Sequence, residues 1–202
     1  MRTFKAPIIF TKNEMSKNDF IETILFIIRK ILDYTSSLNQ ETPSLFDKKR
    51  QKEENDDDNI STSISSNEEN SCNHLLENED EFSLADNLYY WAKIMDFNEN
   101  LLILTIMNID KILAKNFILS SDNVKNILFT SMVITQKYYE DENFNDKDYS
   151  KIVKINTKEL IEMEIELLSL LDFSLNISEG EFNKYKNKMK KIWKNNLLFA
   201  FK

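Results

Sequence analysis

The sequence predicts an all-α fold in which one helical domain holds most of the chain. Only one glycine and two prolines occur in 202 residues, whereas sheet-rich folds usually need more glycine at their tight turns. Apolar residues recur at the helical spacing of three and four in several segments, and no segment has a convincing strand pattern. The residues outside the polar stretch 36–81 are numerous enough for one helical domain.

The first half of the predicted domain contains three helices. A helix over 18–35 has apolar residues on more than one side, which indicates burial between neighbours. A second helix over 84–95 has one apolar face. A third over 98–115 is apolar nearly all round, as is typical of a central helix. Asp110 lies inside this third helix and needs a polar partner if it is buried.

Three further helices are predicted in the second half. The segment 121–139 has an apolar face with small residues, where a neighbouring helix can come close. The polar segment 140–154 is expected to be irregular. Helices over 157–171 and 179–200 follow, and the last has an apolar stripe opposite many lysines.

The acidic charge is concentrated in one segment. Residues 36–81 contain 13 acidic and four basic side chains, a net charge of −9, whereas the whole chain has −8. The remainder is therefore close to neutral and gives no electrostatic reason to expect binding to nucleic acid or to a membrane. The run 60–71 has few apolar residues to bury, so it is expected to be disordered.

The composition also excludes most catalytic chemistry. A phosphate-binding loop needs several glycines, and a thiolate or imidazole zinc site needs about four ligands, whereas Cys72 and His74 are the only cysteine and histidine. No catalytic residue, metal, cofactor or small-molecule ligand is expected. The longest apolar run, 24–28, is far shorter than the ~20 residues of a membrane span, and no signal peptide is evident, so an intracellular location, nuclear or cytoplasmic, is expected.

Several stretches resemble the cyclin box of the P/U-type cyclins, the family of the yeast phosphate-pathway cyclin. The most specific is 163–178, Met-Glu-Ile-Glu-Leu-Leu-Ser-Leu-Leu-Asp-Phe-Ser-Leu-Asn-Ile-Ser, which is similar to the family's Leu-Glu-x-Glu-Phe-Leu-x-Leu-Leu-Asp-Phe-x-Leu-Asn-Val. Residues 108–113, 127–141 and 149–160 also match family motifs, and 24–39 resembles the family's leading helix.

This resemblance implies a single five-helix cyclin box with an extra N-terminal helix and a C-terminal helix. It divides the chain into an N-terminal segment with the leading helix (1–39), an acidic disordered insertion (40–82), and the cyclin box with the C-terminal helix (83–202). It implies a regulatory subunit, not an enzyme, that binds and activates a cyclin-dependent Ser/Thr protein kinase. The alternative is a helical adaptor that uses the same fold for another protein partner or a transcription complex.

The resemblance also implies which residues contact the kinase. In cyclins a lysine at the end of the third box helix and a glutamate on the fifth hydrogen-bond the kinase near its C-helix, and Lys137 and Glu164 match them. Their charged ends are expected to face solvent in the free protein. The apolar positions that grip the kinase correspond to Ile134, Tyr138, Leu168, Phe173 and Leu175.

The chain departs from the family pattern at three places. Tyr90 stands where the family has an arginine thought to pair with the aspartate that matches Asp110, so Asp110 lacks its usual partner. Val153 and Lys154 replace a Gly-Gly pair. The substrate-docking motif Met-Arg-x-x-Leu of cell-cycle cyclins is absent, so that mode of substrate recruitment is not predicted.

Overall fold

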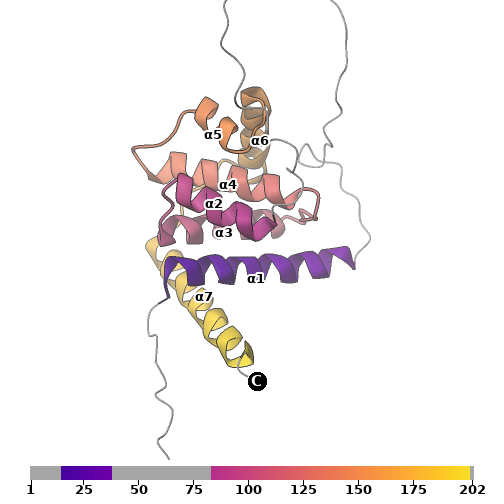
Figure 1. The fold of residues 1–202 in the computed structure, drawn as a ribbon, viewed down its shortest axis with the longest axis vertical. Coiled ribbons are helices and arrows are strands. Elements are labelled where there is room, and N and C mark those ends of the chain that lie inside the picture. The colour runs from indigo at the N-terminus through magenta and orange to yellow at the C-terminus, as the bar shows by residue number, and fades with distance from the viewer. Residues whose placement is uncertain (1–14, 38–82, 201–202) are drawn as a thin grey trace, which may run out of the picture.

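The computed structural model describes residues 15–37 and 83–200, and within these ranges all regular structure is helical. The expected five helices with one flanking helix at each end are confirmed (Figure 1). The insertion predicted over 40–82, with Cys72 and His74, lies outside the described residues. The helices are α1 (Lys17–Ser36), α2 (Leu84–Ile94), α3 (Glu99–Leu113), α4 (Val124–Tyr139), α5 (Asp146–Ile152), α6 (Thr157–Leu170) and α7 (Glu179–Ala200).

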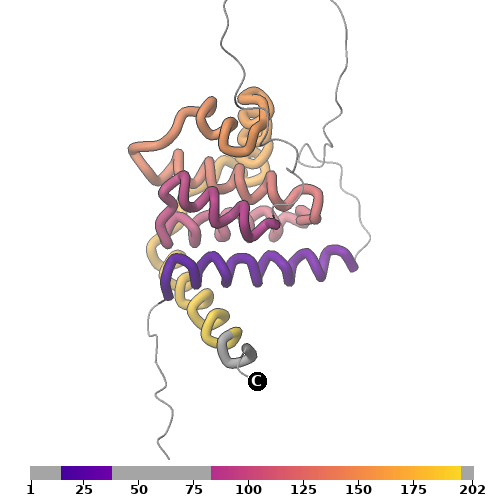
Figure 2. Tube along the Cα trace, viewed as in Figure 1, coloured from indigo at the N-terminus to yellow at the C-terminus, as the bar shows by residue number. Residues whose placement is uncertain are grey.

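The central helices are α3 and α4, as the apolar pattern of the third predicted helix indicated. α3 packs on α4, α1 lies against α2 and α3, and α7 crosses α1 and α3 (Figure 2). α6 packs on the opposite side of α4, and α5 packs on α6. The end formed by α5 and α6 is therefore separated from α1 and α7 by the α3–α4 pair (Figure 1).

Polar side chains fix where the helices begin. Ser16 and Asp19 form a capping box at the start of α1, in which each side chain hydrogen-bonds the other residue's backbone N–H. Ser83 and Asp86 repeat the arrangement at α2. α4 begins a few residues later than predicted, because the Asn123 side chain accepts a hydrogen bond from the Ser120 N–H at 2.8 Å and holds a turn before it.

The prediction that 140–154 is irregular was wrong for its second half, where α5 forms. Asn145 caps this helix by accepting a hydrogen bond from the Asp148 N–H at 3.0 Å, and its amide donates to the Asp148 carboxylate at 2.7 Å. Tyr149 is fully buried on the inner side of α5. A short helix with one large anchor has too few apolar residues to produce a clear helical period.

Four helices end in a left-handed residue although none of these residues is glycine. Asp96, Asn116, Lys154 and Asp172 have φ between 48° and 64°. At Lys154 the φ is 55°, and the following N–H, of Ile155, donates to the Ser150 carbonyl at 3.1 Å, as in a Schellman motif. This is one of the two positions where the family has Gly-Gly, so the backbone retains the turn that the missing glycine would favour.

Replacing Lys154 with glycine is therefore expected to stabilise the domain by about 0.5–1 kcal/mol, because glycine adopts positive φ without the steric cost that a Cβ imposes. The midpoint of urea unfolding measures the change. Lys151→Gly is the matched control, since Lys151 lies within α5 and the same replacement there should destabilise. A lower midpoint for Lys154→Gly would show that contacts of the lysine side chain outweigh the strain.

Asp110 has a partner that the sequence did not reveal. The Tyr185 hydroxyl on α7 donates to the Asp110 Oδ2 at 2.7 Å. Burial raises the pKa of the Asp110 carboxyl, and the hydrogen bond from Tyr185 opposes this shift. Tyr90 lies elsewhere, half-exposed beside a cavity of about 500 Å³ between α2, α4 and the α5–α6 connection. An arginine introduced at position 90 is therefore not expected to restore the family's pair.

Tyr185→Phe is expected to destabilise the domain by about 1–2 kcal/mol, because a partly buried carboxylate loses a charge-assisted hydrogen bond. Chemical denaturation measures the loss. Tyr34→Phe, at an exposed position near the end of α1, serves as the control and should leave the unfolding midpoint unchanged. Equal midpoints for the two variants would mean that the Tyr185–Asp110 bond contributes nothing to the docking of α7.

Candidate partner-binding face

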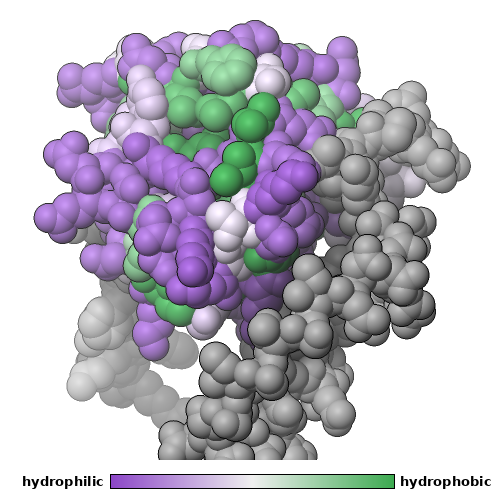
Figure 3. All heavy atoms as spheres, turned by 90° about the horizontal axis from the view of Figure 1, so that it is seen from above, coloured by the Kyte–Doolittle hydropathy of each residue, from purple (hydrophilic) through white to green (hydrophobic). Residues whose placement is uncertain are grey.

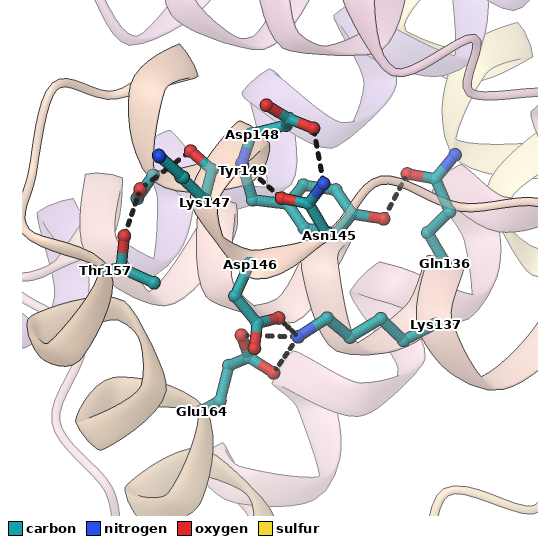
Figure 4. Close-up of polar contacts among 10 residues, drawn as sticks. Gln136, Lys137, Asn145, Asp146, Lys147, Asp148, Tyr149, Thr157 and Glu164 are labelled. Carbon is teal, nitrogen blue, oxygen red and sulfur yellow. Dashed lines mark hydrogen bonds and ion pairs between the residues drawn. The ribbon is translucent and has the colours of Figure 1, made fainter.

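The most prominent polar cluster joins three helices at one end of the molecule. The Lys137 ammonium, in the last turn of α4, contacts both Glu164 carboxylate oxygens on α6, at 2.8 and 2.7 Å. It also forms an ion pair with Asp146, the first residue of α5. Figure 4 shows the two carboxylates converging on this one ammonium group. The structure thus brings together the two charged residues that the sequence singled out.

The expectation that both charged ends face solvent was wrong for Glu164. Only 8% of this residue is exposed, because α6 packs on α4 with Glu164 beside its buried face. Burial raises the pKa of the Glu164 carboxyl, Lys137 lowers it, and the nearby Asp146 charge raises it again. Burial outweighs the effect of Lys137, so the pKa of the Glu164 carboxyl lies above its ordinary value.

Buried hydrogen bonds beside the cluster hold α4, α5 and the end of α2 together. The Tyr149 hydroxyl donates to the Gln136 Oε1 at 3.0 Å, and the Gln136 amide donates to the Met95 carbonyl at 2.7 Å (Figure 4 shows the first of these bonds). The Lys137 ammonium lies 5.6 Å from the centre of the Tyr149 ring. Burial, with the charges of Glu164 and Asp146, raises the Tyr149 pKa to about 12, so its hydroxyl stays protonated.

The predicted apolar contact residues divide into exposed and buried groups. Phe173 is 68% exposed, Tyr138 is also exposed, and Leu168 is half-buried. Ile134 and Leu175 belong to the hydrophobic core instead. Both side chains are buried, and the Leu175 carbonyl accepts a hydrogen bond from the Tyr139 hydroxyl at 2.9 Å.

Sequence reasoning missed three residues on this end of the molecule. Asp146 was missed because its segment was expected to be irregular. Ile161 and Ile165, 38% and 55% exposed on α6, were missed because exposure cannot be read from an apolar period alone. Figure 3 shows this end from above, where hydrophobic residues gather in a band between hydrophilic borders.

The polar side chains of this face form an ion-pair cluster. The cluster consists of one ammonium group, which donates hydrogen bonds, and two carboxylates, which accept them, so its net charge is −1. Among residues 15–37 and 83–200, no group of three or more His, Cys, Asp or Glu side chains could hold a metal ion. No helix in the same ranges is both long enough and apolar enough to cross a membrane.

Comparison with known proteins decides the family. The family model described as Cyclin matches residues 25–175, which is more than half of the chain. The chain belongs to the cyclin family. The predicted resemblance to the P/U-type cyclins is confirmed by similarity to PHO85 cyclin-7 of Saccharomyces cerevisiae and to plant U-type cyclins.

The similarity to these relatives is modest and local. This cyclin is 34% identical over 77 residues to PHO85 cyclin-7, covering 38% of the chain and 27% of the relative. It is 36% identical over 67 residues to Cyclin-U4-1 of Arabidopsis thaliana, covering 33% of each protein. Against Cyclin-U2-1 of the same plant it is 31% identical over 85 residues, covering 41% of the chain and 38% of the relative. The chain therefore spans well under half the length of each of these relatives.

Proposed function

We propose that this cyclin is a regulatory subunit that binds and activates a cyclin-dependent Ser/Thr protein kinase. The observation that carries the proposal is the Lys137–Glu164 pair, because the family resemblance assigns kinase contact to these two positions and they meet at 2.7 Å. The exposed side chains of Tyr138 and Phe173 supply apolar surface on neighbouring segments. Such a partner also implies an intracellular location, in the nucleus or the cytoplasm.

The mechanism needs no chemistry from the cyclin's own residues. A protein kinase is active only when the glutamate of its C-helix pairs with the lysine of its third strand and its activation loop is in place. A rigid helical face that binds the inward position of the C-helix more tightly than the outward one shifts the kinase toward the active state. The α4–α6 face is suited to this role because a buried polar chain and the hydrophobic core fix its side chains.

The test is activation of purified kinases. The full-length chain is added to a panel of cyclin-dependent kinase subunits prepared without their own cyclins, and phosphorylation of a peptide substrate is measured. We expect at least one kinase to be stimulated and to co-elute with the chain in gel filtration. Failure to bind or stimulate any kinase of the panel would overturn the proposal and favour the adaptor function.

A further inference from the structure

The last helix, α7, has a strongly basic surface. Its 22 residues include six lysines, and no acidic side chain follows Glu181. Four of the lysines are exposed to solvent: Lys184, Lys188, Lys191 and Lys194. At about 100° per residue they lie within roughly 120° of arc on the helix surface. This surface, here called the α7 lysine face, is on the opposite side from the buried Met189 and Trp193, so the packing of α7 does not use it.

Neither ion pairs nor the helix dipole account for these charges. Within the part of the chain that the structure describes, no ion pair joins the α7 lysine face to a carboxylate. Lys188 acts on Asp110 only at longer range. The helix dipole favours cations in the last turn, and the last turn of α7 contains no basic residue. The positive charge of this face is therefore available to a partner.

The chain itself contains a segment of complementary charge. Residues 53–81 hold 11 acidic side chains and no lysine or arginine, a net charge of −11. This segment, here called the acidic run, belongs to the insertion between α1 and α2 and lies outside the described residues. Opposite charges attract two surfaces and set their partner choice. The acidic run can therefore match all six lysines of α7.

The connections of the chain allow the acidic run to reach α7. α1 packs on α7, and Figure 1 shows α7 crossing α1 and running past it. α1 has 20 residues and is therefore about 30 Å long. Glu53 follows Ser37 by 16 residues, which span at most about 50 Å. From the end of α1 the acidic run can thus reach any point along that helix, including its crossing with α7.

The same connections favour the acidic run over a separate molecule. Both of its ends are joined to the domain, so its binding is an intramolecular event. Linked segments have effective concentrations of about a millimolar. A polyanion supplied from outside must overcome this advantage before it can take the same surface.

We propose that the α7 lysine face is the docking surface for the acidic run, residues 53–81, of the same chain. The contact is electrostatic and does not depend on the proposed kinase function, because the α3–α4 pair separates α7 from the end formed by α5 and α6. A nucleic acid is the other polyanion that such a face could bind, and the experiments distinguish the two.

The first experiment is cross-linking of the wild-type, full-length chain. A zero-length carbodiimide joins an ammonium group to a carboxylate only where the two touch, and peptide mapping of the monomeric product locates the links. The control is a set of exposed lysines on α5 and α6: Lys147, Lys151 and Lys158. Per lysine, we expect the acidic run to link to the α7 lysine face about fivefold more often than to this set, and less as salt is raised. An even distribution over the two sets would overturn the proposal.

The second experiment measures competition for the face. A labelled synthetic peptide of residues 53–81 is titrated into two full-length chains by fluorescence anisotropy. One chain is the wild type, and in the other the 11 acidic residues of the run are replaced with glutamine or asparagine. We expect the neutralised chain to bind the peptide about tenfold more tightly, because the wild-type face is already occupied. Equal affinities, or no binding to either chain, would contradict the proposal.

Matched lysine variants of the neutralised chain locate the bound peptide. Replacing Lys184, Lys191 and Lys194 with glutamine is expected to weaken binding about fivefold or more. The same replacement at the three control lysines of α5 and α6 changes the net charge equally and should alter the affinity by less than about a factor of two. Equal losses would show attraction to overall charge and not to α7. Circular dichroism confirms folding, and single substitutions replace a triple variant that unfolds.

A labelled single-stranded oligonucleotide separates the acidic run from a nucleic acid as the occupant. We expect the wild-type chain to bind it several-fold more weakly than the neutralised chain, and the glutamine replacements on α7 to remove that difference. Binding by the wild type as tight as by the neutralised chain would assign the face to nucleic acid and overturn the proposal.

Discussion

Replacing Lys137 and Glu164 together with alanine is expected to abolish kinase binding while the domain stays folded. In a complex these groups would be desolvated hydrogen-bond partners of the kinase, and truncating one such group typically costs ~2–5 kcal/mol because its partner is left unpaired. That corresponds to a loss of roughly thirtyfold to several thousandfold in affinity for one group alone. Folding should survive, because the double change removes both charges of the more buried pair, and Asp146, which also loses Lys137, has a side chain that is 40% exposed to solvent.

A matched ion pair on the neighbouring helix provides the control. Lys151 and Asp148 on α5 form an exposed pair at 2.9 Å, and replacing both with alanine changes the same charges. We expect this control to retain kinase binding within a factor of two or three. Wild-type affinity in a folded Lys137→Ala, Glu164→Ala variant would exclude the cyclin-type interface, and the adaptor function would then become the better explanation.

The helical architecture could be predicted because the apolar periods are long and strong. α3 is apolar nearly all round and proved central, and five other segments had at least one recognisable apolar face. α5 escaped prediction because seven residues hold less than two full turns of periodic signal. Its formation depends on the Asn145 cap and on the burial of Tyr149, which only the folded neighbours provide.

The sequence identified the two charged residues of the site, but not the burial of one of them or the other side chains around them. The family motifs identified Lys137 and Glu164, yet no sequence pattern shows that α6 buries the carboxylate or that α5 adds Asp146. The hydrogen bond between Tyr185 and Asp110 could not be predicted for the same reason, since 75 residues separate the two partners in the chain. Both arrangements depend on where helices distant in sequence meet.

Burial of Glu164 makes the stability of the domain depend on Lys137. Lys137→Ala alone is expected to destabilise the free domain by about 1–3 kcal/mol near pH 7, because the carboxylate remains buried without its counter-charge. Lys137 lowers the Glu164 pKa in the wild type, whereas burial and Asp146 raise it. Without the lysine only the two raising effects remain, so the pKa in the variant should rise further.

This shift fixes the sign of the pH dependence. A carboxyl whose folded-state pKa lies above its unfolded value supports folding fully below the unfolded pKa, about 4.3 for glutamate, and loses that contribution as the pH rises through the folded pKa. The penalty of Lys137→Ala should therefore be small at pH 4 and largest near pH 7, as urea unfolding at the two values would measure. Adding Glu164→Gln to Lys137→Ala removes the buried charge and should restore most of the lost stability at pH 7. An equal penalty at both pH values, or no restoration by glutamine, would show that Lys137 stabilises the domain through the contact of its ammonium group with the Tyr149 ring and not through the Glu164 charge.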